Sequence, residues 1–148
     1  MKIPFYKQRT DWACGPTAIR MVLASLKIKK TETELSKLLG TTKKLGTKNK
    51  NFAKILSQLR LNYKIVEEAS IINLKSLLKK QYRTILNYTI PEENVGHYAV
   101  LKKISKDKIY LLDPLFGPKH NYLINKFKKI WHSKSRKNKQ WLIAIKKD

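Results

Sequence analysis

The chain has 148 residues, of which 42% are hydrophobic, and its formal net charge is +23 at pH 7. This length predicts a single domain over residues 1–148 with enough buried surface for a core. The single cysteine excludes an internal disulfide and a zinc site built on several thiols. Membrane-spanning apolar runs and a secretory signal are lacking, so we expect a cytoplasmic protein without a membrane segment.

The first half of the sequence is patterned mainly as helices. Gly15–Leu26 has a broad apolar face and a proline in its first turn, where proline is tolerated. Thr31 and Glu34 form a capping-box signature for a short helix that stops at Gly40. The lysine-rich stretch 41–50 is expected to be an exposed loop. Further helices are predicted at Asn51–Arg60 and at Ile71–Lys80 after a Ser70 cap, with a strand at Asn62–Glu67 between them.

The second half is richer in β-branched and aromatic residues, which indicates strands. We expect strands at Thr84–Ile90, His97–Ile104, Lys108–Asp113 and Trp141–Ile145, with Tyr122–Trp131 either helical or a distorted strand. Helices followed by strands predict an α+β fold in which N-terminal helices pack on a C-terminal antiparallel sheet.

The positive charge has two interpretations. A basic domain is typical of proteins that bind nucleic acid or an anionic surface. However, arginine is preferred for base reading and for bidentate phosphate contacts, and only five of the 33 cations are arginine. The lysines are spread along the chain, with modest clusters at 27–30, 43–50 and 134–139. The charge therefore reflects either overall composition or a functional basic surface, and a nucleic-acid partner is the less favoured alternative.

Cys14 is the first candidate for chemistry. It lies immediately before the predicted helix that opens with Gly15, Pro16 and Thr17. Unpaired N–H groups and the helix dipole at such a position favour the thiolate, which is the reactive form of cysteine. Gly15 has no side chain to crowd an approaching carbonyl group. The alternative is that Cys14 is a small buried apolar residue.

A nucleophilic cysteine needs a base and a group that orients the base. His97 begins a predicted strand, whereas His120 and His132 lie in lysine-rich segments that we expect to be exposed. A hairpin with a five-residue loop, Lys103–Asp107, would pair Leu101 with Ile109 and place His97 directly opposite Asp113, on one face of the sheet. The carboxylate would then accept the Nδ1–H of His97. A two-residue loop at Lys106-Asp107 would instead put His97 and Asp113 on opposite faces. Alternatively, Asp113 only terminates its strand.

Gln8 precedes Cys14 by six residues. Acyl transfer needs hydrogen-bond donors for the developing oxyanion, commonly one backbone N–H and one side-chain amide. Gln8 can supply the amide and Cys14 the N–H, although a surface glutamine is unremarkable by itself.

Three motifs together resemble a known family. They are Gln8 with Cys14-Gly15-Pro16-Thr17-Ala18, then Gly96-His97-Tyr98-Ala99-Val100, then Ile109-Tyr110-Leu111-Leu112-Asp113-Pro114. Their order and spacing over residues 3–117 are similar to those of the bacteriocin-processing, double-glycine leader peptidases, which are papain-like cysteine peptidases. The resemblance implies Cys14 as nucleophile, His97 as base, Asp113 as its orienting group and Gln8 as oxyanion donor.

The resemblance also implies a peptide or unfolded polypeptide as substrate and no metal or organic cofactor. Such peptidases are often the first domain of an ABC transporter, but this sequence has no phosphate-binding loop of the G-x-x-x-x-G-K-[ST] type, so we expect a stand-alone relative. Hydrolysis of a peptide bond is the favoured activity, with acyl transfer less favoured. A catalytically silent peptide-binding module is the alternative from another class.

Overall fold

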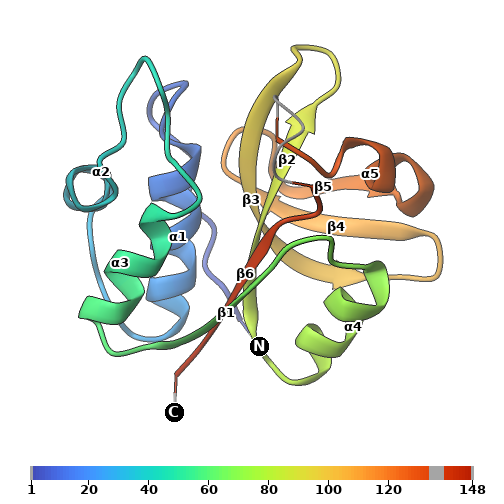
Figure 1. Cartoon of the computed structure of the whole chain (residues 1–148), viewed down its shortest axis with the longest axis horizontal. Helices are drawn as coiled ribbons and strands as arrows, with labels where there is room; N and C mark the ends of the chain where they lie inside the picture. The colour runs from blue at the N-terminus through green and yellow to red at the C-terminus, as the bar shows by residue number, and fades with distance from the viewer. Residues whose placement is uncertain (1, 134–138, 148) are drawn as a thin grey trace.

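The computed structural model describes residues 2–133 and 139–147, so most of the predicted lysine cluster at 134–139 lies outside the described residues. Over these described residues, five helices and six strands follow one another (Figure 1). The helices are α1 (Cys14–Ser25), α2 (Glu32–Leu39), α3 (Asn51–Gln58), α4 (Ile71–Lys79) and α5 (Ile124–Ile130). The strands are β1 (Asn62–Val66), β2 (Arg83–Ile90), β3 (Val95–Ile104), β4 (Lys108–Asp113), β5 (Gly117–Leu123) and β6 (Leu142–Lys146).

The strands form one sheet in the order β1-β6-β2-β3-β4-β5, and every neighbouring pair is antiparallel. Figure 1 shows α1, α2 and α3 on one side of the sheet, and α4 and α5 on the other. The predicted α+β fold, with helices packed on an antiparallel sheet, is therefore confirmed. Because both sheet faces are covered, β2 is buried from its second residue to its last.

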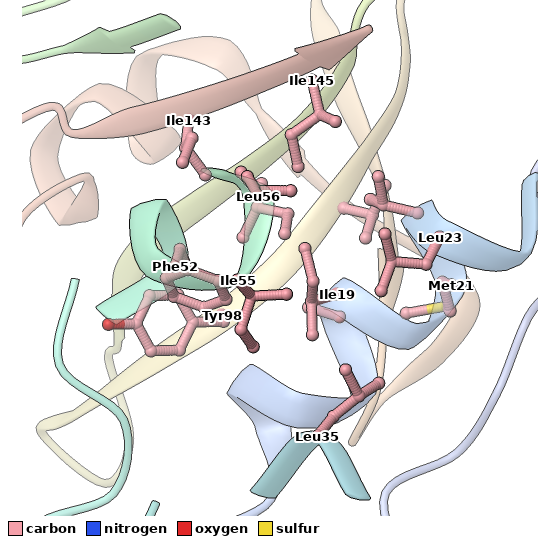
Figure 2. Close-up of a cluster of buried hydrophobic side chains, with 14 of the residues drawn as sticks. Ile19, Met21, Leu23, Leu35, Phe52, Ile55, Leu56, Tyr98, Ile143 and Ile145 are labelled. Carbon is pink, nitrogen blue, oxygen red and sulfur yellow. The ribbon is translucent and has the colours of Figure 1, made fainter. Parts of the chain in front are cut away.

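The first core lies between α1–α3 and the sheet. In Figure 2, Ile143 and Ile145 of β6 point toward Leu56 of α3 and Ile19 of α1. Each of these four side chains is fully excluded from solvent. Burying one such aliphatic side chain contributes about 1.5–3 kcal/mol. This core fixes the position of α1, and hence of Cys14, against the sheet.

The second core lies under α4 and α5. Leu74 of α4 and Phe127 of α5 pack on alternate residues of the central strands, among them Leu86, Tyr88 and Ala99. Tyr88 contacts Phe127 with ring centroids 5.9 Å apart. The face of the sheet that carries Tyr88 is thus excluded from solvent, so its polar groups need hydrogen-bond partners within the protein.

Local sequence signals locate the helix ends correctly. The Thr31 hydroxyl accepts the Glu34 N–H at 3.1 Å, and the Glu34 carboxylate accepts the Thr31 N–H in return. Ser70 and Asn73 form the same reciprocal pair at the start of α4. Gly40 ends α2 with φ of 63°, in the left-handed region that glycine adopts without strain.

The predicted register of the β3–β4 hairpin is wrong. Ile104 pairs with Ile109 instead of Leu101, so the turn is shorter than expected. The Ser105 N–H donates to the Lys108 carbonyl at 2.9 Å and closes it. In the β3–β4 pair Val100 faces Leu112, so Asp113 falls beside Ala99 and not directly opposite His97.

A β-bulge at Lys102 then shifts the pairing by one residue, so that Leu101 faces Leu111. Had the register of the turn continued, His97 and Asp113 would lie on opposite faces. With the bulge, Asp113 falls two residues from the His97 position on the same face. The bulge, and not a five-residue loop, therefore brings His97 and Asp113 to the same face of the sheet.

The region before Trp131 was only partly predicted. Tyr122–Trp131 was expected to be one helical or distorted segment, but β5 ends at Leu123 and α5 begins at Ile124. Most of β5 was missed because its polar, alternately exposed residues lack the apolar pattern of a buried strand.

Candidate active site

Cys14 is the first residue of α1 and is 9% exposed. The residue before it, Ala13, offers no side-chain cap to the helix. Backbone N–H groups of the first turn are therefore left without the usual capping oxygen, and together with the helix dipole they favour negative charge. This agrees with the expected position of Cys14 at a helix amino terminus.

Gly15 has a different role from the one expected. A Cβ added there would lie 2.3 Å from Thr47 Oγ1 and 2.7 Å from Thr47 Cβ. Distances this short do not occur between real side chains, so the absence of a side chain at Gly15 allows the loop at residues 41–50 to pack on α1. Space for a substrate carbonyl is not what the structure shows at this position.

His97 and Asp113 are hydrogen-bonded and buried. His97 Nε2 lies 2.7 Å from Asp113 Oδ1, with the two residues 3% and 0% exposed. The prediction that Nδ1 of His97 faces the carboxylate is wrong. Asp113 lies diagonally across from His97, beside Ala99, and not directly opposite it. At this position the carboxylate is met by Nε2, the ring nitrogen farther from the backbone. Nδ1 takes no part in this bond.

The positive charge of His97 and the negative charge of Asp113 stabilise each other. Burial of His97 disfavours its imidazolium form, but hydrogen bonds to Asp113 and Cys14 and their negative charges raise the pKa of His97 to about 10. Burial of Asp113 works against its ionised form, yet His97 and the Tyr88 hydroxyl hold the pKa of Asp113 below its usual value. Asp113 is thus bonded to His97, and Cys14 acts on the pKa of the same ring.

Gln8 is buried and is hydrogen-bonded to the chain just after the end of β4. Its N–H donates to the Pro114 carbonyl at 2.9 Å, directly after Asp113 in the chain. Its side-chain amide donates to the Thr10 carbonyl at 2.8 Å, and its Oε1 is buried without a hydrogen-bond partner among the described residues. The structure therefore ties the segment before Cys14 to the end of β4, while one N–H of the amide is already engaged.

A cleft of about 490 Å³ opens beside Cys14. Its walls come from the start of α1, from the 41–50 loop and from β2 and β3. Three lysines of the loop line it, Lys43, Lys44 and Lys48, against one carboxylate, Asp11. The loop was expected to be exposed, and it mostly is; sequence reasoning missed that it forms a wall of the cleft.

Hydrogen bonds hold this loop to β3 as well as to itself. The Tyr98 hydroxyl donates to the Thr47 carbonyl at 3.0 Å and contacts Asn49 Oδ1. The Thr41 and Thr47 hydroxyls lie 2.7 Å apart. Tyr98 follows His97 in the chain, so β3 contributes to the cleft on one face and to the buried His97–Asp113 pair on the other.

The surroundings of the other two histidines were not fully predicted. His120 lies in β5, stacks on Phe116 at 4.6 Å, and has a buried Nε2 without a partner among the described residues. Burial lowers the pKa of His120. His132 contacts the Thr89 hydroxyl and the Ser133 carbonyl. The expectation that both segments are exposed is therefore wrong for the His120 ring nitrogen.

Within residues 2–133 and 139–147, histidine, cysteine and acidic side chains form no group of three or more suited to a metal ion. Over the same residues, none of the helices has the length and apolar character needed to cross a membrane.

Comparison with known proteins identifies relatives over nearly the whole chain. Residues 2–135 match the model of the Peptidase C39 family. The peptidase domain of Streptococcus ComA, a bifunctional ABC transporter involved in quorum sensing, superposes with a TM-score of 0.80 at 16% identity, covering 99% of this chain and 100% of that one. Comparison with curated protein sequences gives no match.

Two further solved structures share the fold. A C39-like peptidase from Bacillus anthracis has a TM-score of 0.77 at 15% identity, covering 99% of this chain and 96% of its own. A double-glycine-motif protease from an AMS/PCAT transporter, solved with its leader peptide, has a TM-score of 0.74 at 19% identity, covering 99% and 93%. The expected resemblance to papain-like leader peptidases is confirmed, and the chain belongs to the Peptidase C39 family of cysteine peptidases.

Proposed function

We propose that this protein hydrolyses a peptide bond with Cys14 as nucleophile, His97 as general base and acid, and Asp113 as the group that orients His97. The observation that carries the proposal is the buried 2.7 Å bond between His97 and Asp113, together with Cys14 at a helix amino terminus that lines a cleft. The influence of Cys14 on the pKa of His97 supports the same grouping. We further propose that residues 1–148 act as one domain.

The reaction follows from these groups. The Cys14 thiolate attacks the substrate carbonyl, and the negative charge moves to the carbonyl oxygen. The Cys14 N–H stabilises this oxyanion, and we propose the Gln8 amide as a second donor. The His97 imidazolium gives its proton to the leaving amine, which yields an acyl-enzyme. Neutral His97 then takes a proton from water, and the resulting hydroxide releases the acid and regenerates Cys14.

The substrate that we propose is an extended peptide, cut in the cleft. One solved relative holds a leader peptide, so a peptide whose leader ends in two glycines is the first candidate.

Asp113 stays ionised throughout these steps, because the buried carboxylate serves only to accept the hydrogen bond from the Nε2–H of His97.

The test is cleavage of a peptide panel, followed by mass spectrometry in H₂¹⁸O. Hydrolysis places one ¹⁸O in the new carboxylate, whereas acyl transfer to an amine places none. Cys14→Ala is the control that should abolish product without unfolding the protein. Peptide binding without turnover by the unmodified protein, over the whole panel, would favour the silent binding module instead.

A further inference from the structure

Tyr88 lies in β2, directly opposite His97 in the β2–β3 pair, and is fully buried. Its hydroxyl donates to Asp113 Oδ2 at 2.5 Å. Its ring meets the His97 ring edge-on, with centroids 5.5 Å apart and planes at 89°. Tyr88 therefore contacts both members of the His97–Asp113 pair, Asp113 by a hydrogen bond and His97 by packing.

The Asp113 carboxylate is surrounded by donors. Oδ1 accepts from His97 Nε2, from the Leu115 N–H at 2.9 Å and from the Phe116 N–H at 3.0 Å. Oδ2 accepts from the Tyr88 hydroxyl. Four donors converge on a group that is 0% exposed, an arrangement that suits an acceptor-only, ionised carboxylate.

We propose that Tyr88 is a positioning residue for this active site: its hydroxyl keeps Asp113 ionised and turned toward His97, so that His97 presents Nδ1 to Cys14. This inference rests on the proposed function for its consequence in turnover. The hydroxyl acts as a donor because burial, and then the neighbouring Asp113 charge, raise the pKa of Tyr88. A protonated Asp113 would need an acceptor where Tyr88 offers a donor.

Other titratable groups near the pair must be separated from Tyr88. They are His97 from β3, His120 and Tyr122 from β5, Glu92 from the β2–β3 turn, and Cys14 from α1. Tyr122 touches the Tyr88 ring at 5.7 Å but is not among the donors to Asp113. Its hydroxyl also hydrogen-bonds to Tyr88, so Tyr122→Phe acts on Tyr88 only indirectly and leaves the four donors to Asp113 in place. It therefore serves as a graded comparison for Tyr88→Phe.

The experiment measures the rate of Cys14 alkylation and of peptide cleavage against pH for the unmodified protein, Tyr88→Phe and Tyr122→Phe. Without the Tyr88 donor, the ionised form of Asp113 is less stabilised and its pKa rises. The acid limb of both profiles should move up by roughly one pH unit. The alkaline limb, set by His97, should stay, and Tyr122→Phe should move the acid limb by less than Tyr88→Phe does.

A loss of amplitude alone would mean a structural role, so a second variant keeps the hydroxyl. Replacing Tyr88 by 3,5-difluorotyrosine makes the phenol a stronger donor of nearly the same size, and the acid limb should move down. Folding is checked by near-ultraviolet circular dichroism at each pH. If Tyr88→Phe folds and its acid limb coincides with that of the unmodified protein, the proposal is overturned.

NMR titration of the Asp113 carboxyl separates this inference from the peptidase proposal, because it needs no turnover. A higher Asp113 pKa in Tyr88→Phe supports the positioning role even if none of the tested peptides is cut. An unchanged Asp113 pKa rejects that role even if cleavage by Cys14 is established.

Discussion

The two sides of the site are held in different ways. On the sheet side, His97 and Asp113 are buried and joined by a hydrogen bond of 2.7 Å. The Asp113 carboxylate also accepts hydrogen bonds from the Tyr88 hydroxyl and the Leu115 N–H. On the helix side, Cys14 is positioned by the backbone of α1 and by the fit of Thr47 against Gly15. The sheet side therefore depends on specific polar groups, and the helix side on shape. Mutations should act on charge and proton transfer in the first case and on cleft geometry in the second.

The largest effect is expected from removal of His97 on the sheet side. His97→Ala should lower peptide turnover on the order of 10⁴–10⁶-fold, because both proton transfers are lost. In the unmodified protein, Cys14 should react with iodoacetamide well below pH 7, since an imidazolium that persists to about pH 10 stabilises the thiolate beside it. His97→Ala should lose this low-pH reactivity. Reactivity that rises only near about pH 8.5 in the unmodified protein would exclude the ion pair.

The next effect is expected at Asp113. Asp113→Ala should lower turnover on the order of 10⁴-fold, because His97 loses its partner at Nε2. Asp113→Asn should retain more activity, since an amide oxygen can still accept the Nε2–H. Initial rates on one peptide, with folding checked by circular dichroism, measure both. Equal rates for Asp113→Ala and the unmodified protein would mean that Asp113 only terminates β4.

A third effect, intermediate in size, concerns Gln8. An oxyanion donor acts mainly in the transition state, so Gln8→Ala should lower kcat by about 10²–10³ with little change in KM. Iodoacetamide labelling of Cys14 should be normal, because His97 and α1 are untouched. Gln8→Glu should be no better, since a carboxylate repels the oxyanion. Near-normal kcat in Gln8→Ala would remove it from the oxyanion site, and lost labelling would show that it supports the local fold.

The elements of this fold were predictable where local chemistry decides them. The reciprocal cap of Thr31 and Glu34 needs only residues three positions apart, and α2 begins and ends as the sequence indicates. Which residues share a sheet face depends on register, and the unpaired Lys102 left no signal in the sequence. The approach of His97 to Asp113 was therefore predictable from their spacing, but the ring nitrogen of His97 that meets Asp113 was not.

Residues that act through contacts between distant segments were missed altogether. Tyr88 reads as one more aromatic residue of a buried strand, and only the paired β2 and β3 bring its hydroxyl to Asp113. Thr47 in the lysine-rich loop likewise gains its role from contacts with Gly15 and Tyr98. The lysines are a similar case. Three loop lysines line the cleft, but the spacing of lysines in the sequence could not predict that position.

The smallest effect on chemistry is expected on the helix side, at Gly15. Gly15→Ala places a methyl group 2.3 Å from Thr47 Oγ1, so the 41–50 loop must move or α1 must shift. Overpacking of this kind typically costs about 1–3 kcal/mol in the free energy of unfolding, which urea denaturation measures. Turnover should fall mainly through a higher KM, because the loop forms a wall of the cleft while His97 and Asp113 keep their bond. Thr47→Gly in the same protein should recover most of the stability, since it removes the atoms that the new methyl group meets. If Gly15→Ala is as stable as the unmodified protein and binds peptide equally well, the fit between α1 and the loop does not set the shape of the cleft.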